Sequence, residues 1–178
     1  SKLFGAPCFF ADIEVEKLYR TNRQCFLKLR RKFPQFIKTF PIKKIELTNT
    51  VKKKFSNLKT IGFIVHPFVR KKLNIFLKNN KKKKIVVLDI PLYLENKIHR
   101  KEDIIIFLKT KKKDVNFRLK KRKNFNQKLL NILRKSQFTL KQKKNKSHYV
   151  LVNNYNSAIM KKKVKILKAK ILNDRSST

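Results

Sequence analysis

The hydrophobic and polar residues of this chain follow two patterns that alternate along the sequence. Short continuous apolar runs are typical of buried strands, and between them apolar residues recur every three or four positions, as in helices that bury one face. The expected strands are residues 8–10, 85–88, 104–108 and 148–152. Strands that alternate with helices predict an α/β fold with a mainly parallel sheet and helices on both faces.

The second apolar run opens the stretch IVVLDIPLYLE at residues 85–95. Four apolar residues without alternation predict a strand buried on both faces, which then ends at Asp89 and Pro91. Open α/β sheets bind ligands at the carboxyl ends of their strands, so Asp89 is a candidate for phosphate or metal chemistry. An Asp in such a place also serves as an ordinary turn residue, and this alternative stays open.

The beginning of the chain predicts a short strand followed by a helix. Residues 1–4 have the pattern of a helix end, with Gly5 as its stop, and residues 8–10 follow as a strand. A helix is expected from Ile13, which places Asp12 near its N-terminus. Asp12 is therefore either a capping residue or a catalytic carboxylate at a strand end.

Residues 23–60 are basic and mostly helical in pattern, with interruptions at Pro34 and Pro41. This pattern indicates a helical subdomain that carries no recognisable catalytic motif. The lysine run at residues 81–84 leads into the next strand and is expected to be a solvated turn.

His66 and Pro67 interrupt an apolar segment further along the chain. A His beside Pro is expected to be a structural cap rather than a ligand. Arg70 lies about one helical turn after His66, so the sharper alternative is that the two side chains hold a phosphate together.

The second half of the chain contains three further expected helices. Residues 111–123 predict a strongly basic helix in which Arg118 and Arg122 are four residues apart and hence neighbours on one face. Another helix is expected at residues 126–137, and a closing amphipathic helix at residues 158–172.

Composition adds a strong positive charge, because 49 Lys and Arg residues against 10 Asp and Glu give a formal net charge of +39. Such a field attracts polyanions, although the abundance of Lys, Asn, Ile and Phe is also what A- and T-rich codons produce. Two cysteines are too few for a disulfide framework, which favours a cytoplasmic location. No apolar run approaches the roughly 20 residues that a membrane span requires, so no membrane association is expected.

The motif content narrows the chemistry. The sequence contains no CxxC, HExxH or GxSxG, which argues against a zinc site or a hydrolase triad. Acidic residues at two strand ends and arginines on a basic helix suit phosphoryl transfer, which depends on positioning and charge neutralisation. The phosphate-binding loop GxxxxGK[ST] does not occur in these residues.

The order of these pieces resembles the dephospho-CoA kinases of the P-loop metabolite kinase superfamily over nearly the whole chain. The matching segments are GAPCFFAD at 5–12, IVHPFVR at 64–70, VLDIPLYLE at 87–95 and YVLVNN at 149–154. The family's lid arginines correspond to Arg118 and Arg122, and a glutamine of the following helix corresponds to Gln137.

This resemblance implies transfer of the ATP γ-phosphate to the ribose 3′-hydroxyl of dephospho-CoA, with Mg²⁺, as the last step of coenzyme A synthesis. It implies a single domain over residues 1–178, with a helical acceptor subdomain at about 23–80 and a lid with its following helix at about 111–138. A monomer or weak homo-oligomer is expected. The implied roles are catalysis for Asp12 and Arg118, acceptor binding for His66, Arg70, Pro91, Leu92 and Glu95, ATP binding for Arg118, Arg122 and Asn153, and a place near Mg²⁺ for Asp89.

The chain also departs from the family pattern. Phe10 replaces the first aspartate of a pair, Tyr93 replaces a leucine, and Tyr155 stands where a glycine is usual. The first strand and the P-loop are expected just before Ser1, so the chain is expected to be an N-terminal truncation. The alternatives are a basic RNA- or ribosome-binding protein, and another small-metabolite kinase of the same superfamily.

We predict that a pure preparation of residues 1–178 transfers no phosphate from ATP to dephospho-CoA. The reason is that the backbone amides and lysine of a P-loop, which bind the γ-phosphate, are not in this sequence. A coupled assay of ADP release measures this directly. Kinase turnover by the pure chain would contradict the prediction.

Overall fold

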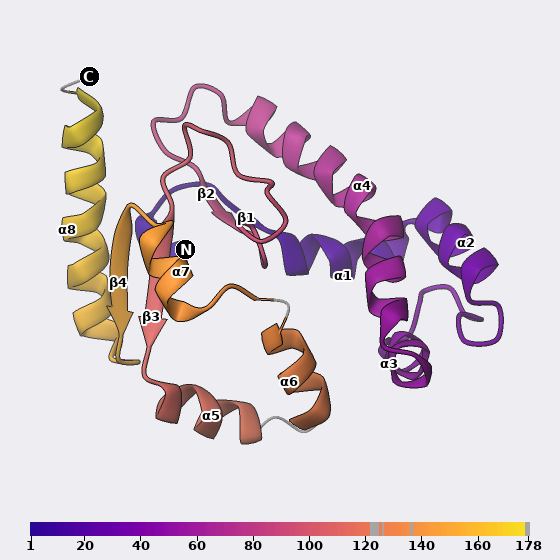
Figure 1. Ribbon diagram of the computed structural model, residues 1–178. Helices are drawn as coiled ribbons and strands as arrows, with labels where there is room; N and C mark the ends of the chain where they lie inside the picture. Colours follow the sequence, from indigo (N-terminus) through magenta and orange to yellow (C-terminus); the bar gives the residue numbers. More distant parts are fainter. Residues whose placement is uncertain (122–124, 126, 136, 177–178) are drawn as a thin grey trace. The chain divides into compact units, whose positions relative to one another are not determined.

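The computed structural model describes residues 1–121, 125, 127–135 and 137–176 (Figure 1). The chain divides into two compact units, Ser1–Pro91 and Leu92–Thr178. Each unit is described by itself.

The first unit contains a parallel strand pair and a group of helices. Its elements are the 3₁₀ helix η1 (Lys2–Phe4), β1 (Cys8–Phe10), α1 (Ala11–Thr21), α2 (Arg23–Lys32), α3 (Lys44–Lys53), α4 (Ser56–Asn79) and β2 (Val87–Asp89). β1 and β2 are parallel, and the register pairs Cys8 with Val87 and Phe10 with Asp89. Gly5 ends η1 in the left-handed conformation at φ 56°, as the sequence predicted.

The core of this unit is formed by the helices, which confirms the helical pattern predicted for residues 23–60. Leu29 and Ile37 are fully buried in it, together with the free thiol of Cys25, whose pKa burial raises to about 11. Asn22 caps α2 by accepting a hydrogen bond from the Cys25 backbone amide at 2.7 Å. The other buried members are Leu18, Phe26, Phe33, Ile42, Ile61 and Val65.

Helix α4 runs through His66 and Pro67 without ending, so the prediction that His66 is a structural cap was wrong. Pro67 lacks an amide hydrogen and its ring crowds the carbonyl one turn earlier, which bends a helix but need not stop it. Figure 1 shows α4 changing direction partway along its length. Buried Val65 and Leu73 lie on either side of Pro67, and their burial favours keeping both halves of the helix in place.

Strand β2 is shorter and more open than the sequence indicated. The prediction was a strand buried on both faces over residues 85–88, whereas the strand is Val87–Asp89, with Val87 and Leu88 half-buried and Asp89 exposed. Within the described residues β2 pairs only with β1, so its other edge has no neighbouring strand. Lysines 81–84 are exposed and lie in turns and irregular chain, as predicted.

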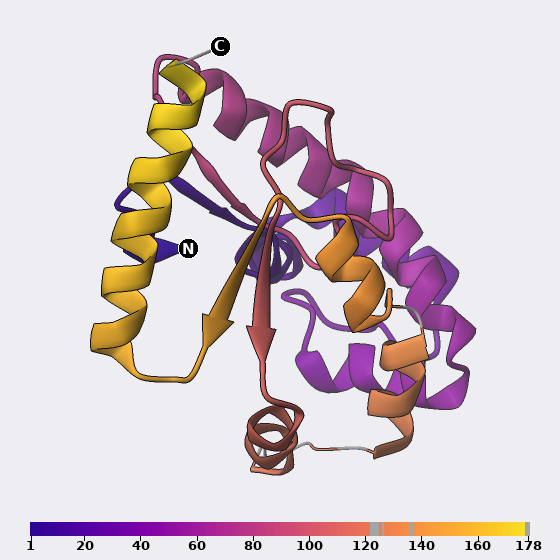
Figure 2. The ribbon, with the colours of Figure 1, turned by 60° about the vertical axis from the view of Figure 1, so that its left-hand side comes forward.

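The second unit contains another parallel pair. Its elements are β3 (Ile106–Thr110), α5 (Lys112–Lys120), α6 (Gln127–Lys135), α7 (Leu140–Asn145), β4 (Tyr149–Asn153) and α8 (Ser157–Ser176). The register pairs Ile106 with Tyr149 and Thr110 with Asn153, and Figure 2 shows both arrows pointing the same way. Strand β3 begins two residues later than predicted, at Ile106. The short helix α7 was not predicted from the sequence.

Helix α8 confirms the closing amphipathic helix. Its buried residues Met160, Val164, Leu167 and Ile171 follow one another at spacings of four and three, which is one stripe of a helix. Lysines occupy much of the remaining surface, and Figure 2 shows α8 alongside β4.

Both strand pairs are parallel and separated along the chain by helices, which confirms the predicted α/β class with a parallel arrangement. The four strands form two two-stranded sheets in the part of the chain that the structure describes. No helix among the described residues has the length and apolar character needed to cross a bilayer.

We predict that Leu29→Ala lowers the free energy of unfolding by about 2–5 kcal/mol, because it removes a fully buried side chain and leaves a cavity. Leu27→Ala on the same helix is the matched control: Leu27 is 53% exposed and its loss is expected to cost no more than about 0.5 kcal/mol. Urea denaturation followed by circular dichroism measures both. Equal effects of the two substitutions would contradict the assigned core.

Candidate active site

The carboxyl end of the β1–β2 pair brings two aspartates to one edge. Phe10 ends β1 and is paired with Asp89, which ends β2, and α1 starts directly after Phe10. Asp12 is in the first turn of α1, so it follows that same edge by two residues. Parallel pairing therefore collects the two predicted carboxylates where such sheets bind ligands.

Asp12 is exposed, and its side chain makes no hydrogen bond or ion pair with any described residue. The N-cap position of α1 belongs to Phe10 and has no side-chain cap bond, so the alternative that Asp12 caps the helix was wrong. Its place is inside the first turn of α1, near the positive end of the helix dipole. Asp12 is thus an available carboxylate at a strand end.

Asp89 is also exposed, and its Oδ2 atom accepts a hydrogen bond from the Ser1 hydroxyl at 3.2 Å. Among the described residues, no three His, Cys, Asp or Glu side chains gather into a metal cluster. Mg²⁺ in kinase sites is held by one or two carboxylates together with substrate phosphates and water. The hard oxygen ligand that Asp89 offers fits this requirement.

His66 and Arg70 lie one turn apart on α4, and both are exposed. The imidazole of His66 lies against Gly62, where an added methyl group would be 3.3 Å from the Cε1 and Nε2 atoms. Helical side chains point back toward the preceding turn, so the residue four positions before His66 is the one that its imidazole contacts. Partial burial and, secondarily, the positive charge of Arg70 lower the pKa of His66 below its ordinary value.

The turn after β2 holds Leu92 in the left-handed region at φ 55°, where bulky residues are uncommon. The following loop is closed by the Tyr93 hydroxyl, which donates to Asp103 at 2.7 Å. Burial and this hydrogen bond raise the pKa of Tyr93. Pro91, the exposed residue before the turn, ends the first unit, and Leu92 begins the second.

Glu95 is engaged within the second unit. Its carboxylate accepts a hydrogen bond from the Phe138 backbone amide at 3.0 Å and pairs with Lys143 Nζ at 3.4 Å. Lys143 also donates to Gln137 at 2.9 Å. Only 10% of the Glu95 side chain is exposed, so it joins the turn after β2 to the segment after α6.

The carboxyl end of the β3–β4 pair forms a second group of predicted residues. Asn153 ends β4 half-buried, and its Oδ1 atom accepts a hydrogen bond from the Tyr155 amide at 2.8 Å. Tyr155 itself adopts φ 61°, which explains why a glycine suits this position. Thr110, the register partner of Asn153, leads into α5.

Arg118 on α5 is stacked on Tyr155, with its guanidinium carbon 3.8 Å from the ring centroid. A cation–π contact at an exposed site contributes about 0.5–1 kcal/mol. The left-handed conformation costs a non-glycine residue roughly 1–2 kcal/mol. The free energy gained from the stack therefore does not offset the free energy cost of the left-handed backbone at Tyr155. Arg122 lies outside the described residues.

A shallow groove of about 310 Å³ lies between β1, α1 and α4 in the first unit. Its lining is mainly apolar, and Lys17 and Lys72 are among the charged side chains. Asp12, His66 and Arg70 do not line it, so this groove is separate from the predicted acceptor residues.

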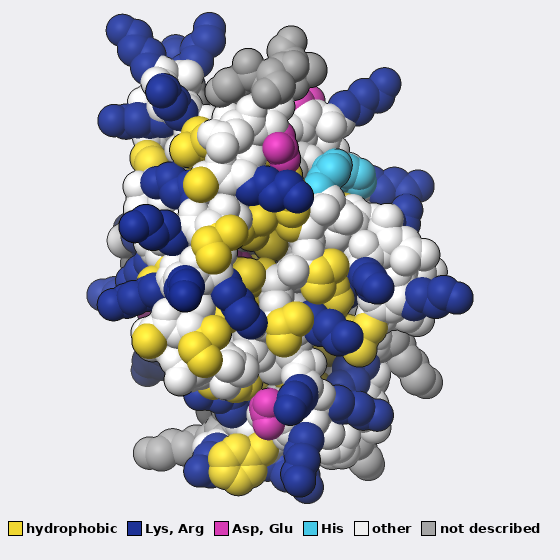
Figure 3. Space-filling model, turned by 90° about the vertical axis from the view of Figure 1, so that its left-hand side faces the viewer, with side chains coloured by type: hydrophobic (Ala, Val, Ile, Leu, Met, Phe, Trp, Pro, Cys, Tyr) yellow, Lys and Arg dark blue, Asp and Glu magenta, His cyan; other side chains and the backbone are white. Residues whose placement is uncertain are grey.

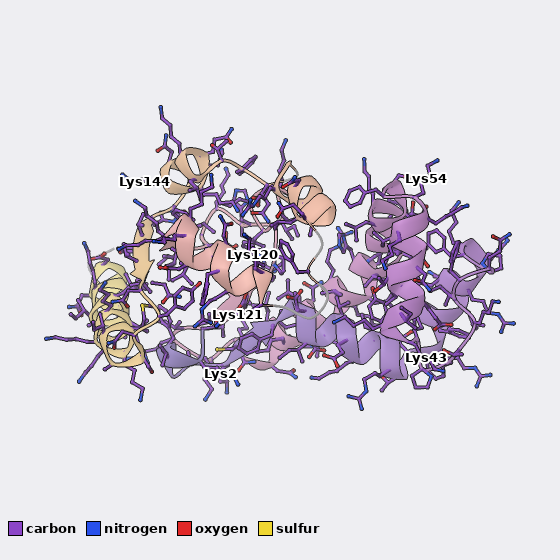
Figure 4. All side chains as sticks on the ribbon, turned by 90° about the horizontal axis from the view of Figure 1, so that it is seen from below. Lys2, Lys43, Lys54, Lys120, Lys121 and Lys144 are labelled. Carbon is purple, nitrogen blue, oxygen red and sulfur yellow. The ribbon has the colours of Figure 1, made fainter. Side chains whose placement is uncertain are left out.

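The positive charge is dispersed rather than gathered. Figure 3 shows Lys and Arg side chains scattered among hydrophobic ones on one face, with few acidic groups. The lysines labelled in Figure 4 come from separate elements: Lys2 is in η1, Lys43 and Lys54 flank α3, Lys120 and Lys121 are at the end of α5, and Lys144 is in α7. The labelled lysines therefore do not lie on one helix, as the basic residues of a single recognition helix would.

The sequence predicted Asp12, Asp89 and the His66–Arg70 pair as candidates, whereas Gly62 and Lys143, which contact His66 and Glu95, were not predicted. A signal existed for Gly62, since it is one of two glycines in the chain and precedes His66 by four residues. None existed for Lys143, because it is one lysine among many.

We expect the imidazole of His66 to titrate below pH 6.5 in an NMR titration, and Arg70→Met to raise the midpoint because a nearby positive charge is lost. The unfolded chain takes up this proton first as pH falls, so stability linked to His66 is constant above about pH 6.5 and declines below it. Lys71→Met, which removes a charge from the adjacent position, is the control. An unchanged midpoint in Arg70→Met would show that Arg70 does not act on His66.

Comparisons with known proteins show which family this chain resembles. A family model for dephospho-CoA kinase matches residues 2–158. Dephospho-CoA kinase of Wolbachia sp. subsp. Brugia malayi (strain TRS) is 32% identical over 152 residues, covering 84% of this chain and 77% of the relative. That of Wolbachia pipientis wMel is 29% identical over 150 residues, covering 83% and 76%.

Solved structures show the same fold. Dephospho-CoA kinase from Campylobacter jejuni superposes with a TM-score of 0.58 at 20% identity, over 96% of this chain and 90% of that one. A Thermus thermophilus protein gives a TM-score of 0.70 at 20% identity, over 95% and 86%. The match of the family model and the relative 32% identical together establish that this chain belongs to the dephospho-CoA kinase family.

Proposed function

We propose that the protein transfers the γ-phosphate of ATP to the 3′-hydroxyl of dephospho-CoA, the last step of coenzyme A synthesis. The observation that carries the proposal is the register of Phe10 with Asp89, in a chain of this family. That register puts an available carboxylate and a potential metal ligand at one edge of a parallel pair. Phosphoryl transfer needs this combination of positioning and charge neutralisation.

Asp12 is proposed as the general base that accepts the proton of the attacking 3′-hydroxyl. A base must have a free lone pair within reach of the hydroxyl, and the Asp12 carboxylate is exposed and without a side-chain partner among the described residues. The neighbouring Glu14 differs because it is paired with Lys17 at 2.7 Å. Asp12 is therefore the better placed of the two acidic side chains in this turn.

Asp89 is proposed to hold Mg²⁺, which would neutralise charge on the ATP phosphates when bound. The Ser1 hydroxyl, an uncharged donor, occupies only the Oδ2 atom of Asp89. A carboxylate oxygen is therefore still available for a cation.

His66 and Arg70 are proposed to bind phosphate groups of the acceptor. The lowered pKa leaves His66 uncharged at neutral pH, so it offers a hydrogen bond while Arg70 supplies the positive charge. Pro91, Leu92 and Glu95 are proposed to border the acceptor site. Because the Glu95 carboxylate is already occupied by Phe138 and Lys143, we propose that it acts by holding the turn.

Arg118, Arg122 and Asn153 are proposed for the ATP side, with the arginines on phosphates and Asn153 near adenine. The segment at about 111–138 would be the lid with its following helix, and about 23–80 the acceptor subdomain. A cytoplasmic location and a monomer or weak homo-oligomer complete the proposal. The dispersed charge gives no support to an RNA-binding function.

The acceptor assignment is tested by calorimetric titration of dephospho-CoA into residues 1–178. We expect Arg70→Met to weaken binding about tenfold, because a charge-assisted hydrogen bond to phosphate is lost. Gly62→Ala should also weaken binding through displacement of the His66 imidazole, although alanine favours the helix by about 1 kcal/mol.

Lys71→Met is the matched control, since it removes the same charge from the neighbouring exposed position. Equal losses in Arg70→Met and Lys71→Met would mean that only overall charge matters, and would contradict the assignment. A panel of other phosphorylated acceptors, titrated under the same conditions, separates dephospho-CoA from the substrates of related kinases.

A further inference from the structure

The contact between Arg118 and Tyr155 joins two parts of the second unit that are distant in sequence. Arg118 is in the last turn of α5, and Tyr155 is in the connection between β4 and α8. The guanidinium carbon lies 3.8 Å from the ring centroid, which is close enough for direct stacking. The aromatic ring that contacts Arg118 therefore belongs to a residue positioned directly after β4.

The stack leaves the hydrogen-bonding edge of Arg118 open. A guanidinium is planar, its five N–H donors point outward in that plane, and stacking uses only the face. Arg118 is exposed, and it makes no hydrogen bond or ion pair with another residue of the described part of the chain. Its orientation is therefore restrained while its donors remain free for an anion.

The backbone of Tyr155 supports a role beyond stability. The residue is held at φ 61° by a connection in which Asn153 accepts from its amide at 2.8 Å. A glycine would adopt this conformation without strain, and the stack is too weak to offset that strain. The Tyr155 ring therefore provides a contact with Arg118 that a glycine at this position, although less strained, would not provide.

The surroundings favour a negatively charged ligand. Lys163 of α8 reaches the Val152 carbonyl at 3.3 Å, which places a second cation at the end of β4. Thr110 and Asn153 end the two paired strands at the same edge. Ligands of parallel α/β sheets bind at this edge.

We propose that Tyr155 is a positioning residue that holds Arg118 with its N–H edge open for the phosphates of the nucleotide. The proposal deepens the proposed function and rests on its assignment of ATP to this edge. Tyr155 acts through Arg118, and its ring is not a platform for the adenine. Removing the ring should therefore weaken phosphate binding and leave the nucleoside unaffected.

The first test needs no ligand. The Nε–Hε resonance of Arg118 in residues 1–178 is expected upfield of the other arginines because of the Tyr155 ring current. Tyr155→Phe should keep the shift and Tyr155→Leu should abolish it. Phe117→Leu is the control. It removes another exposed ring of α5, and that ring contacts Lys121 rather than Arg118. A resonance unaffected by Tyr155→Leu overturns the proposal.

The second test measures dissociation constants for ATP, tripolyphosphate and adenosine in about 0.3 M salt, where distant lysines are largely screened. Tyr155→Leu should weaken ATP and tripolyphosphate about two- to fivefold and leave adenosine unchanged. In an Arg118→Met background, Tyr155→Leu should have no further effect. A loss of adenosine affinity, or equal losses in both backgrounds, overturns the proposal because the ring would then act on its own.

Failure of the proposed function would look different. If tripolyphosphate follows the expected pattern but ATP binds no better than tripolyphosphate, the nucleotide assignment fails and the positioning of Arg118 stands. If ATP binds better than tripolyphosphate while Tyr155→Leu changes nothing, the nucleotide assignment stands and the role of Tyr155 is refuted.

Discussion

The parallel pairing of Phe10 with Asp89 is the constraint on which the proposed active site depends. It aligns the ends of β1 and β2, so that Asp89 and the first turn of α1 follow the same edge. A slip of one residue would turn the side chains of the strand to opposite faces and move Asp89 away from that edge. The apolar contacts of Phe9 with Phe76 and of its cluster with Leu88 favour the observed register.

The second unit applies the same principle with different side chains. Thr110 and Asn153 end paired strands, and the connections that follow them carry Arg118 and Tyr155. In both units the regular strands determine where irregular segments begin, and those segments carry the polar groups. Polar residues placed in this way can vary without a change of the sheet.

Much of this arrangement could be predicted from the sequence, because apolar runs and helical periodicity report burial directly. The helix through Pro67 could not, since its continuation depends on packing of Val65 and Leu73 rather than on local preference. The engagement of Glu95 by Lys143 joins residues 48 positions apart, and no local pattern signals it. The stack of Arg118 on Tyr155 joins residues distant in sequence, and Tyr155 makes it from a left-handed backbone that is uncommon for tyrosine and is not signalled by the local sequence.

The most direct test of this account is the rate of coenzyme A formation by the protein as its gene encodes it, with Asp12→Asn compared against Glu14→Gln. Glu14 is on the same helix and its carboxylate is paired with Lys17, so it serves as the matched control. We expect Asp12→Asn to lower kcat by about 10²–10⁴ with little change in the KM for dephospho-CoA, while Glu14→Gln stays near the unsubstituted rate. An Asp12→Asn protein that turns over at the unsubstituted rate would contradict the assignment of Asp12 as the base.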